Sequence, residues 1–411
     1  PVLDSTDAPK IADLHKRSVT AVILENQEKA FAQESAQLTE AAAANKTGAG
    51  VDNWDPVLIS LVRRSTPALL AFDLVGVQPM TGPTGLIFAM KSRYGTQGGT
   101  EALFDEADTS FSMGAGSSPS ATVSSDMFAG DSGDADAVDD YTPGAGLATA
   151  DMEALGTTGG TAIPQMAFSI DKTTVTAKSR ALKAEYTIEL AQDLKAVHGL
   201  SAETELANIL STEILAEMNR EIIRTINVNS VTSVLASGEY DMTDATDNAG
   251  ARWLVERVKS MVFAIEKEAN QIAVSTRRGK GNFVIVSHGV AAALNSAGAM
   301  DTGLGLSGPQ GFDSDATGSL FAGTLNGRMK VYIDPYAAVD YYTVGYKGTN
   351  PYDAGIFYCP YVPLSMMKTI GESDFQPRIG FKTRYGLADN PFVTAGAGAN
   401  VYYRKRKVVN L

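Results

Sequence analysis

The chain has 411 residues, of which 44% are hydrophobic and 20% are charged. That length suits two or three packed regions, and that composition favours a folded chain over a disordered one. No run of about 18 uncharged apolar residues occurs, and no basic segment followed by an apolar one opens the chain. We therefore expect neither a membrane-spanning helix nor a signal peptide, and the single cysteine, Cys359, excludes an internal disulfide.

The net charge of −13 is concentrated in one part of the chain. Residues 94–171 contain no Lys or Arg but contain thirteen of the 47 acidic residues. The remaining 34 acidic residues equal the 34 basic ones, so the rest of the chain is neutral. A nucleic-acid-binding protein would show a basic stripe, and this pattern argues against that class.

The first 50 residues indicate a tail or arm with a weakly amphipathic helix. Asp7 suits a helix N-cap, and Pro9 suits the first turn. The apolar stripe that we expect on this helix comprises Ile11, Leu14, Ala21 and Val22. A linker composition follows up to Gly50.

A long hairpin is expected next. Residues 86–90 read as a strand after the turn at Gly82-Pro83, whereas residues 94–166 are rich in Gly, Ala, Ser, Thr and Asp and predict a long acidic surface excursion. Strand character returns at Phe168 and continues with near period-two alternation to Ile188. We expect this strand to pair with residues 86–93.

Two helices have the clearest patterns. Residues 201–227 start at Ser201, a suitable N-cap, and an apolar residue recurs at every fourth position. At about 1.5 Å per residue this helix is about 40 Å long and is typical of a structural strut. A second helix is expected over about 252–275, with one face formed by Leu254, Val258, Met261, Ile265, Ala269 and Ile272.

The C-terminal part predicts strands around one further short helix. The strands are expected at 283–286, 329–333, 341–346, 355–359 and 400–409, and the helix at 289–294. This mixture of helices and strands predicts an α+β fold.

No set of residues indicates an active site. Gly303–Gly308 matches the dinucleotide pattern G-x-G-x-x-G, but Pro309 follows where a helix would have to begin. His15, His198 and His288 lie far apart and show no zinc spacing, and Cys359 has no partner base near it in the sequence. We expect no catalytic residue, no cofactor and no metal site, and we expect His198 at a helix end.

Two charged clusters favour solvated surfaces over ligand sites. The acidic residues between Asp131 and Asp140 lack the glycine and the closing glutamate of a calcium loop. The basic run Arg404–Lys407 lies in an expected strand, whose side chains alternate between two faces, so we expect a strand that faces solvent or another subunit. Long projecting elements without an active site point to an assembling structural protein.

Several blocks of the sequence resemble the major capsid proteins of T-even-like tailed phages. They run from about residue 55 to the C-terminus, with only the acidic excursion unmatched. The blocks are Leu61–Arg64, Ala71–Met80, Pro83–Gly85, Ala177–Ala184, Glu189–Gly199, Gly281–Phe283, Val331–Asp334, Thr343–Gly348 and Gly380–Gly386.

The resemblance implies the HK97-like capsid fold, with an N-terminal arm, an extended β-hairpin loop, a spine helix, and peripheral and axial domains. On that basis the extended loop spans 83–190 with the acidic insertion at about 94–166, and 201–227 is the spine helix. The remaining divisions are the arm or pro-segment 1–50, the start of the core 51–82, the peripheral domain 191–300, the mainly axial 301–390 and the C-terminal strand 391–411.

The implied function is a major capsid protein that assembles into hexamers and pentamers. These would form an icosahedral or prolate head shell around double-stranded DNA without sequence-specific binding, built in the host cytoplasm and retained in the virion. The implied partners are further copies of the chain, a portal, a scaffold and a prohead protease, with decoration or vertex proteins as further candidates. Two alternatives stay open: a cellular nanocompartment shell of the same fold, and a nucleotide-binding enzyme that uses residues 303–308.

The resemblance also implies a maturation cleavage between Glu40 and Ala41, because Leu38-Thr39-Glu40 looks like the apolar-x-Glu site of prohead proteases. A second expectation concerns charge, and it places basic hairpin residues against acidic residues of a neighbouring subunit. The candidates are Arg93, Lys172, Arg180 and Lys183.

Overall fold

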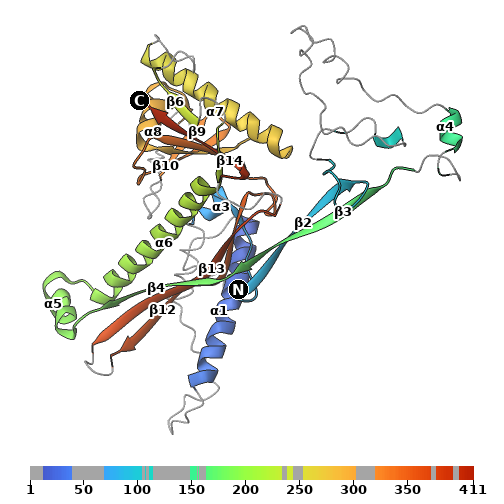
Figure 1. Ribbon diagram of the computed structural model, residues 1–411. Coiled ribbons are helices and arrows are strands. Elements are labelled where there is room, and N and C mark those ends of the chain that lie inside the picture. The colour runs from blue at the N-terminus through green and yellow to red at the C-terminus, as the bar shows by residue number, and fades with distance from the viewer. Residues whose placement is uncertain are drawn as a thin grey trace. The chain divides into compact units, whose positions relative to one another are not determined.

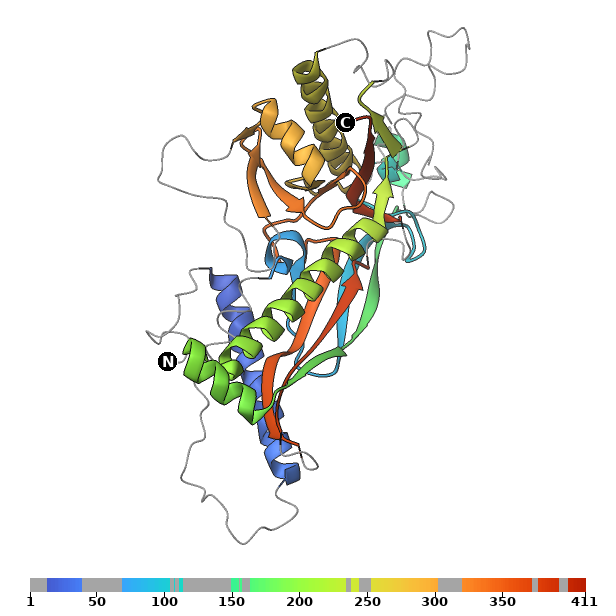
Figure 2. The same cartoon turned by 90° about the vertical axis from the view of Figure 1, so that its left-hand side faces the viewer.

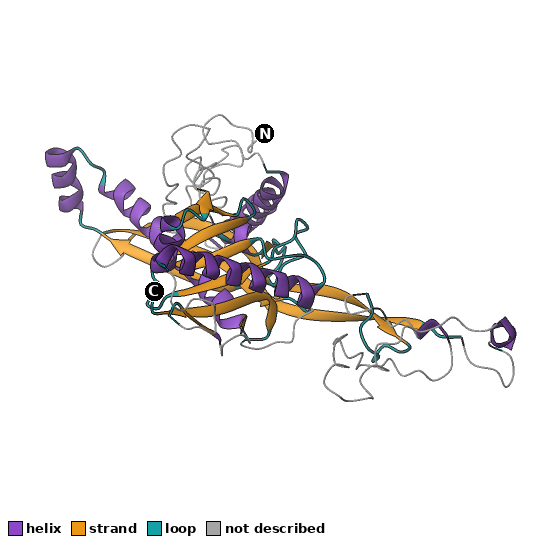
Figure 3. Ribbon diagram, turned by 90° about the horizontal axis from the view of Figure 1, so that it is seen from above, coloured by secondary structure: helices purple, strands orange, loops and turns teal. Residues whose placement is uncertain are grey.

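The structure of the chain is a computed structural model. The described residues are 13–38, 69–103, 107, 111–113, 149–154, 156, 163–233, 238–243, 253–301, 320–371, 376–391 and 398–411. The chain divides into two compact units, one formed by residues 1–87 with 173–411 and the other by residues 88–172. Helices and strands both contribute to the first unit, which confirms the expected α+β class (Figure 3).

The first unit contains two sheets. A four-stranded sheet, here the β12 sheet, has the order β1-β12-β13-β4. Its strands are β1 (Gly76–Val77), β12 (Ile356–Ile370), β13 (Pro377–Asp389) and β4 (Lys178–Glu185). A larger sheet, here the β14 sheet, has the order β5-β14-β11-β7-β10-β9-β8, with β6 also paired to β14. Its strands are β5 (Ser230–Thr232), β6 (Glu239–Asp241), β7 (Phe283–Ser287), β8 (Met300–Asp301), β9 (Leu320–Leu325), β10 (Met329–Asp334), β11 (Tyr341–Gly345) and β14 (Asn400–Val409).

Helices cover both sheets (Figure 1). The β12 sheet packs against α1 (Leu14–Leu38) and α6 (Ala202–Asn229), and α5 (Ile188–His198) leads into α6 (Figure 2). The β14 sheet packs against α7 (Leu254–Thr276) and α8 (His288–Ser296). The short helix α3 (Ala71–Leu74) precedes β1. No described helix is both long and apolar enough to cross a membrane.

The predicted strut helix is confirmed as α6. Its buried face includes Leu210, Ile214, Met218, Ile222 and Ile226, which are the residues of the predicted fourfold repeat after Leu206. Each such side chain stabilises the fold by about 1.5–3 kcal/mol when it leaves water. Ser201 occupies the N-cap as expected, although its side chain forms no capping hydrogen bond.

The second predicted helix is α7, and its predicted face is correct except at one end. Val258, Met261, Ile265, Ala269 and Ile272 are buried against the β14 sheet. Leu254 is exposed, because it is the first helical residue and lies beyond the edge of that contact. The predicted strands at 283–286, 329–333, 341–346 and 400–409 and the helix at 289–294 are confirmed to within two residues at each end.

The strand expected at 355–359 is much longer in the structure. Strand β12 continues beyond the expected end at residue 359, through Pro360 and Pro363, to Ile370. The pairing with β13 shifts register between Pro360 and Val362 and again between Val362 and Ser365. These bulges let a strand contain prolines, which lack the N–H group that a regular ladder needs.

The hairpin pairs differently from our expectation. Strand β3 (Met166–Thr176) pairs with β2 (Thr84–Tyr94), as expected (Figure 1). The continuation beyond Ala177 was also assigned to this hairpin, and that was wrong. Strand β4 instead pairs with β13, in a register that places Lys183 opposite Gly380. The period-two pattern runs through both strands, so it could not reveal the change of partner.

The N-terminal segment is also more firmly placed than a loose arm. Among residues 14–29 of α1 the buried apolar residues are Val19 and Ile23, which join the core cluster of the β12 sheet. The predicted stripe was wrong at Leu14 and Ala21, which are exposed, whereas Val22 is half-buried and Ile11 lies outside the described residues. The proposed cap at Asp7 lies outside the described residues.

Two arginines of the basic run are buried rather than solvent-facing. In β14, Arg404 Nε donates to Glu268 Oε2 on α7 at 2.7 Å, and both side chains are almost fully buried. Arg406 donates to the Glu239 backbone oxygen and lies over the Tyr240 ring at 5.1 Å. The expectation of a solvent- or subunit-facing strand is therefore wrong for these two residues, since Arg404 meets a carboxylate and Arg406 a backbone carbonyl and an aromatic ring inside the unit.

Glu268→Ala should destabilise the chain strongly. It leaves the Arg404 guanidinium buried without its carboxylate, which costs about 3–5 kcal/mol of unfolding free energy. The double variant Glu268→Leu/Arg404→Met should lose much less, because no buried charge remains. Urea denaturation of the unassembled chain measures both, and an equal loss in the two variants would contradict this account.

Candidate assembly surfaces

One register relates the two strands of the hairpin. Gly95 N donates to Gln165 O, and Ala177 N donates to Pro83 O, both at 2.9 Å. In each of these two bonded pairs the residue numbers add to 260. The pairs lie at opposite ends of the hairpin, so the register is the same at both ends. Because side chains alternate across a strand, the even-numbered residues of β2 and β3 share one face and the odd-numbered residues share the other.

The even-numbered face of the outer hairpin is apolar and exposed. Between 55% and 66% of the surface of each of its five large apolar side chains is accessible. These side chains are Phe88, Met90, Met166, Phe168 and Ile170. Five neighbouring large apolar residues on one face exceed what a monomeric soluble protein normally leaves in water, and such a patch marks an interaction surface.

The odd-numbered face of the same strands is polar and satisfied within the chain. Lys91 forms an ion pair with Asp171 at 2.9 Å. Arg93 donates to Ser169 Oγ at 3.0 Å and to the Gly99 backbone oxygen at 2.8 Å. The hairpin therefore has one face with internal partners and one apolar face without cover among the described residues.

The predicted contact residues fall into different environments. Lys172 lies on the apolar face, opposite Phe88 in this register, and forms no ion pair with a described residue. Arg93 belongs to the polar face. Lys183, on β4, is 74% exposed and pairs with Glu185 at 2.8 Å.

Arg180 is engaged inside its own subunit. Its guanidinium donates to Glu217 at 2.9 Å and to Glu221 at 2.7 Å, both on α6. Its Nε donates to the Tyr385 hydroxyl at 2.5 Å. This network holds α6 across β4 and β13. A contact from Arg180 to a neighbouring subunit stays a prediction, and it would have to share a guanidinium that already has three partners.

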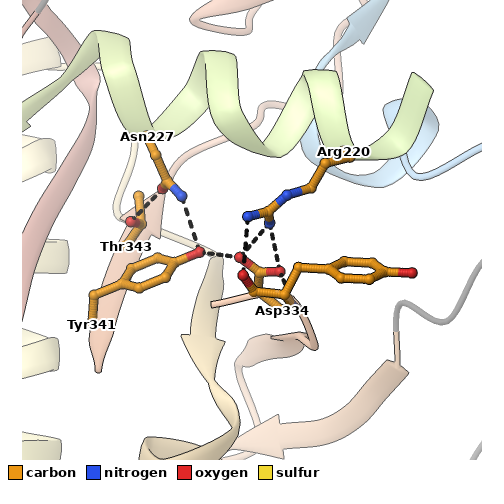
Figure 4. Close-up of polar contacts among 6 residues, drawn as sticks. Arg220, Asn227, Asp334, Tyr341 and Thr343 are labelled. Atoms are coloured by element: carbon orange, nitrogen blue, oxygen red, sulfur yellow. Dashed lines mark hydrogen bonds and ion pairs between the residues drawn. The ribbon is translucent and has the colours of Figure 1, made fainter. Parts of the chain in front are cut away.

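A polar cluster joins α6 to the β14 sheet (Figure 4). Arg220 Nη1 donates to both oxygens of Asp334 at 2.6 Å, and the Tyr341 hydroxyl donates to Asp334 at 2.7 Å. Asn227 donates to the Tyr341 hydroxyl at 2.9 Å and accepts from Thr343 at 2.8 Å. Burial and the hydrogen bond to Asp334 raise the pKa of Tyr341, so it remains a neutral donor. We call these five residues the α6 clasp.

A second tie connects α3 to the segment after β11. Lys347 Nζ donates to the Phe72 backbone oxygen in α3. Burial lowers the pKa of Lys347 to about 8, and the nearby Asp73 carboxylate opposes that shift. The chain therefore contains an ammonium group that loses its proton around pH 8.

The structure gives no support to catalysis by the candidate residues that it describes. Cys359 is buried, and burial raises the pKa of its thiol to about 12, so it is not a ready nucleophile. His15 lies on α1, His198 ends α5 as predicted, and His288 begins α8. Among the described residues no group of three or more His, Cys, Asp or Glu could hold a metal ion.

Some sequence expectations fall outside the described residues. Glu40, Ala41, the loop 303–308 and the acidic cluster 131–140 all do so. The cleavage between Glu40 and Ala41 stays a prediction.

The apolar face of the hairpin was not predicted from the sequence as an exposed surface. Leu86, Phe88 and Met90 alternate in β2, and Met166, Phe168 and Ile170 alternate in β3. That alternation was visible in the sequence, but it normally identifies the side of a strand that packs inward. It could not show that this side stays exposed.

Comparison with known proteins gives one consistent family. Residues 51–408 match the family model described as "Major capsid protein Gp23". A protein named "Major capsid protein" from Serratia phage KSP90 is 40% identical over 100% of this chain and 96% of its own length. A protein of the same name from Enterobacteria phage T4 is 38% identical over 97% of this chain and 92% of its own length. A solved structure titled "The capsid of Myoviridae Phage XM1" is 9% identical over 83% of this chain and 92% of its own length, with a TM-score of 0.41.

The tie through Lys347 predicts a pH-dependent stability. Between pH 8 and about 10.4, the usual lysine pKa, the unfolded chain holds a proton at this residue that the folded chain has lost. The unfolding free energy should therefore rise with pH in that window, by up to about 1.4 kcal/mol per pH unit from this group. Lys347→Met removes the ammonium and should remove this rise. Urea titrations of both proteins between pH 7.5 and 9.5 test it, and parallel pH profiles would refute it.

Proposed function

The chain belongs to the Gp23 family of major capsid proteins, and from this premise we propose that the apolar face of the β2–β3 hairpin is a surface through which copies of the chain assemble into the phage head shell. Major capsid proteins form the shell of the head of tailed phages, so the chain is a structural protein of the virion. The observation that carries the proposal is the exposure of five large apolar side chains on one face of the outer hairpin.

The free energy available from this face is large enough to matter. A Phe or Ile side chain that passes from water into an interface contributes about 1.5–3 kcal/mol. The entropy lost on ordering and association offsets part of that gain, so the net free energy of each contact is modest. A closed shell repeats the contact in every subunit, and modest contacts then give a stable particle that can still correct assembly errors.

The finer features of the shell belong to this proposal. Copies of the chain form hexamers and pentamers in the host cytoplasm, and the closed shell encloses double-stranded DNA without reading its sequence. A portal, a scaffold and a prohead protease act during assembly, and decoration or vertex proteins bind the finished shell. The chain is not an enzyme in this proposal.

We assign the peripheral domain to the β12 sheet with α6, and the axial domain to the β14 sheet with α7 and α8. The α6 clasp supports the assignment of α6 as the spine, because it links the helix of one sheet to the strands of the other. The boundary is not linear in sequence. Residues 301–390 contribute strands to both sheets.

In this proposal, charged side chains fix the register in which the apolar hairpin face meets a second copy. Lys172 lies on the apolar face, and Lys183 is exposed on β4 with only Glu185 beside it. Both are suitably placed to meet carboxylates of a neighbouring copy. Pairs of this kind set partner choice and association rate more than affinity.

Phe88→Ser should separate assembly from folding. Phe88 is mostly exposed, so its loss should change the unfolding free energy of the unassembled chain by less than about 0.5 kcal/mol. The concentration needed for shell assembly should rise roughly tenfold or more. Light scattering with negative-stain electron microscopy measures assembly. Phe88→Leu is the matched control and should assemble normally, because it keeps an apolar side chain. Normal assembly by Phe88→Ser would show that the hairpin face is not an assembly surface.

Lys183→Glu should slow assembly in a salt-dependent way. The change replaces an attraction to a neighbouring carboxylate by a repulsion, and salt screens both. The defect should be largest at low ionic strength and should fade as salt is raised. Lys183→Gln, which only removes the charge, should give a smaller defect. If Lys183→Glu assembles normally at physiological salt, Lys183 is not needed for pairing between subunits.

A further inference from the structure

Helix α1 covers the place where the hairpin begins. The side chains that are buried among its residues 14–29 share one helix face, and the helix packs against β12. They are Val19, Thr20, Ile23, Asn26 and Gln27. Two of the five are amides, and their hydrogen bonding differs.

Asn26 satisfies two backbone carbonyls at once, that of the buried Met80 and that of the half-buried Tyr361. Its Nδ2 donates to Met80 O at 2.6 Å and to Tyr361 O at 3.1 Å. Tyr361 is skipped in the pairing of β12 with β13, which passes from Pro360–Tyr385 to Val362–Arg384. A bulge of this kind leaves a carbonyl without its ladder partner, and a buried carbonyl needs a donor.

Met80 links this contact to the root of the hairpin, by which we mean residues 80–87 with 173–177. Its backbone N–H donates to Pro360 O at 2.9 Å, which is the last such bond before the chain enters β2. Its side chain is buried with Ile87 of β2 and Val175 of β3. One residue thus has its carbonyl held by α1 and its side chain held by both strands of the root.

The rest of the α1 contact is less complete. The Gln27 side chain is buried, yet neither its oxygen nor its nitrogen forms a hydrogen bond within the described part of the chain. A small cavity of about 30 Å³ also remains beside Ile23, between α1, α6 and β12. A buried amide without partners costs free energy, and a void forfeits contacts. Asn26 therefore carries a large share of the specific attachment.

We propose that α1 is a releasable strap that fixes the root of the hairpin through Asn26. When α1 is docked, Met80 and the bulge at Tyr361 are held together. When α1 leaves, both carbonyls lose this donor and the root loosens. The consequence for assembly, namely that the docked state of α1 regulates how the hairpin face meets a second copy, rests on the proposed function above. The strap itself does not.

The test is hydrogen exchange with mass spectrometry on the full-length, unassembled chain carrying Asn26→Asp. Aspartate has nearly the same shape but has no N–H group to offer the two carbonyls. We expect amides of α1 and of the hairpin root to exchange roughly tenfold faster or more, while those of β7, in the β14 sheet, keep their protection. Faster exchange in α1 with an unchanged root would overturn the proposal.

The neighbouring residue provides the matched control. Gln27→Met removes the amide that has no partner and keeps the volume, so it should leave exchange at the root unchanged or slower. Ile23→Ala weakens α1 docking without touching either carbonyl, and it should loosen the root as Asn26→Asp does. Lost protection in β7 would show that Asn26→Asp unfolds the whole chain. In that case Ile23→Ala provides the test: faster exchange in both α1 and the root supports the proposal, and faster exchange in α1 with an unchanged root overturns it. Because no shell is needed, failure of the strap is distinguishable from failure of the hairpin face in assembly.

Discussion

The Asp334 carboxylate is the constraint on which the arrangement of the first unit depends. Its side chain is almost fully buried, and a buried carboxylate is tolerable only when charged and neutral donors surround it. Arg220 comes from α6 and Tyr341 comes from β11, so the requirement to satisfy one charge brings the long helix and the β14 sheet together. The apolar face of α6 fixes how the helix lies on the β12 sheet, and the clasp fixes where its C-terminal half meets the other sheet. The orientation of the two sheets thus depends both on apolar packing and on a single buried charge.

The hairpin shows the opposite use of side chains. Its polar face is satisfied by residues of its own two strands, whereas its apolar face has no cover among the described residues. A two-stranded hairpin alone is marginally stable in water, so the ion pair and hydrogen bonds on the polar face help to keep it formed before any partner arrives. A preformed hairpin also lowers the ordering cost of association. In this way the intramolecular bonds of one face prepare the other face for a second copy.

The elements that could be predicted from the sequence are those with strong local periodicity. Helices α6 and α7 and the strand β14 follow from spacing alone, because each buries a regular face. Contacts between distant segments could not be predicted. Arg404 and Glu268 are 136 positions apart, so the sequence does not show that the charge of Arg404 is paired inside the chain. The role of Asn26 could not be predicted either. Nothing in the sequence of a polar helix indicates that one of its amides bonds to the carbonyls of residues 80 and 361. Of the candidate contact residues, the pattern found the basic side chains but not the apolar face that surrounds Lys172.

The environment of Cys359 has a practical consequence for studying this chain. Its sulfur is the only thiol in the sequence, and it is both buried and held in the protonated form. Maleimides and similar reagents attack exposed thiolates, so the folded protein should resist them without any change to its sequence. A cysteine introduced at a chosen surface position would then take up a fluorophore or spin label alone. Each subunit can therefore be labelled at one site, and slow labelling of the native thiol would report transient opening of the core around β12.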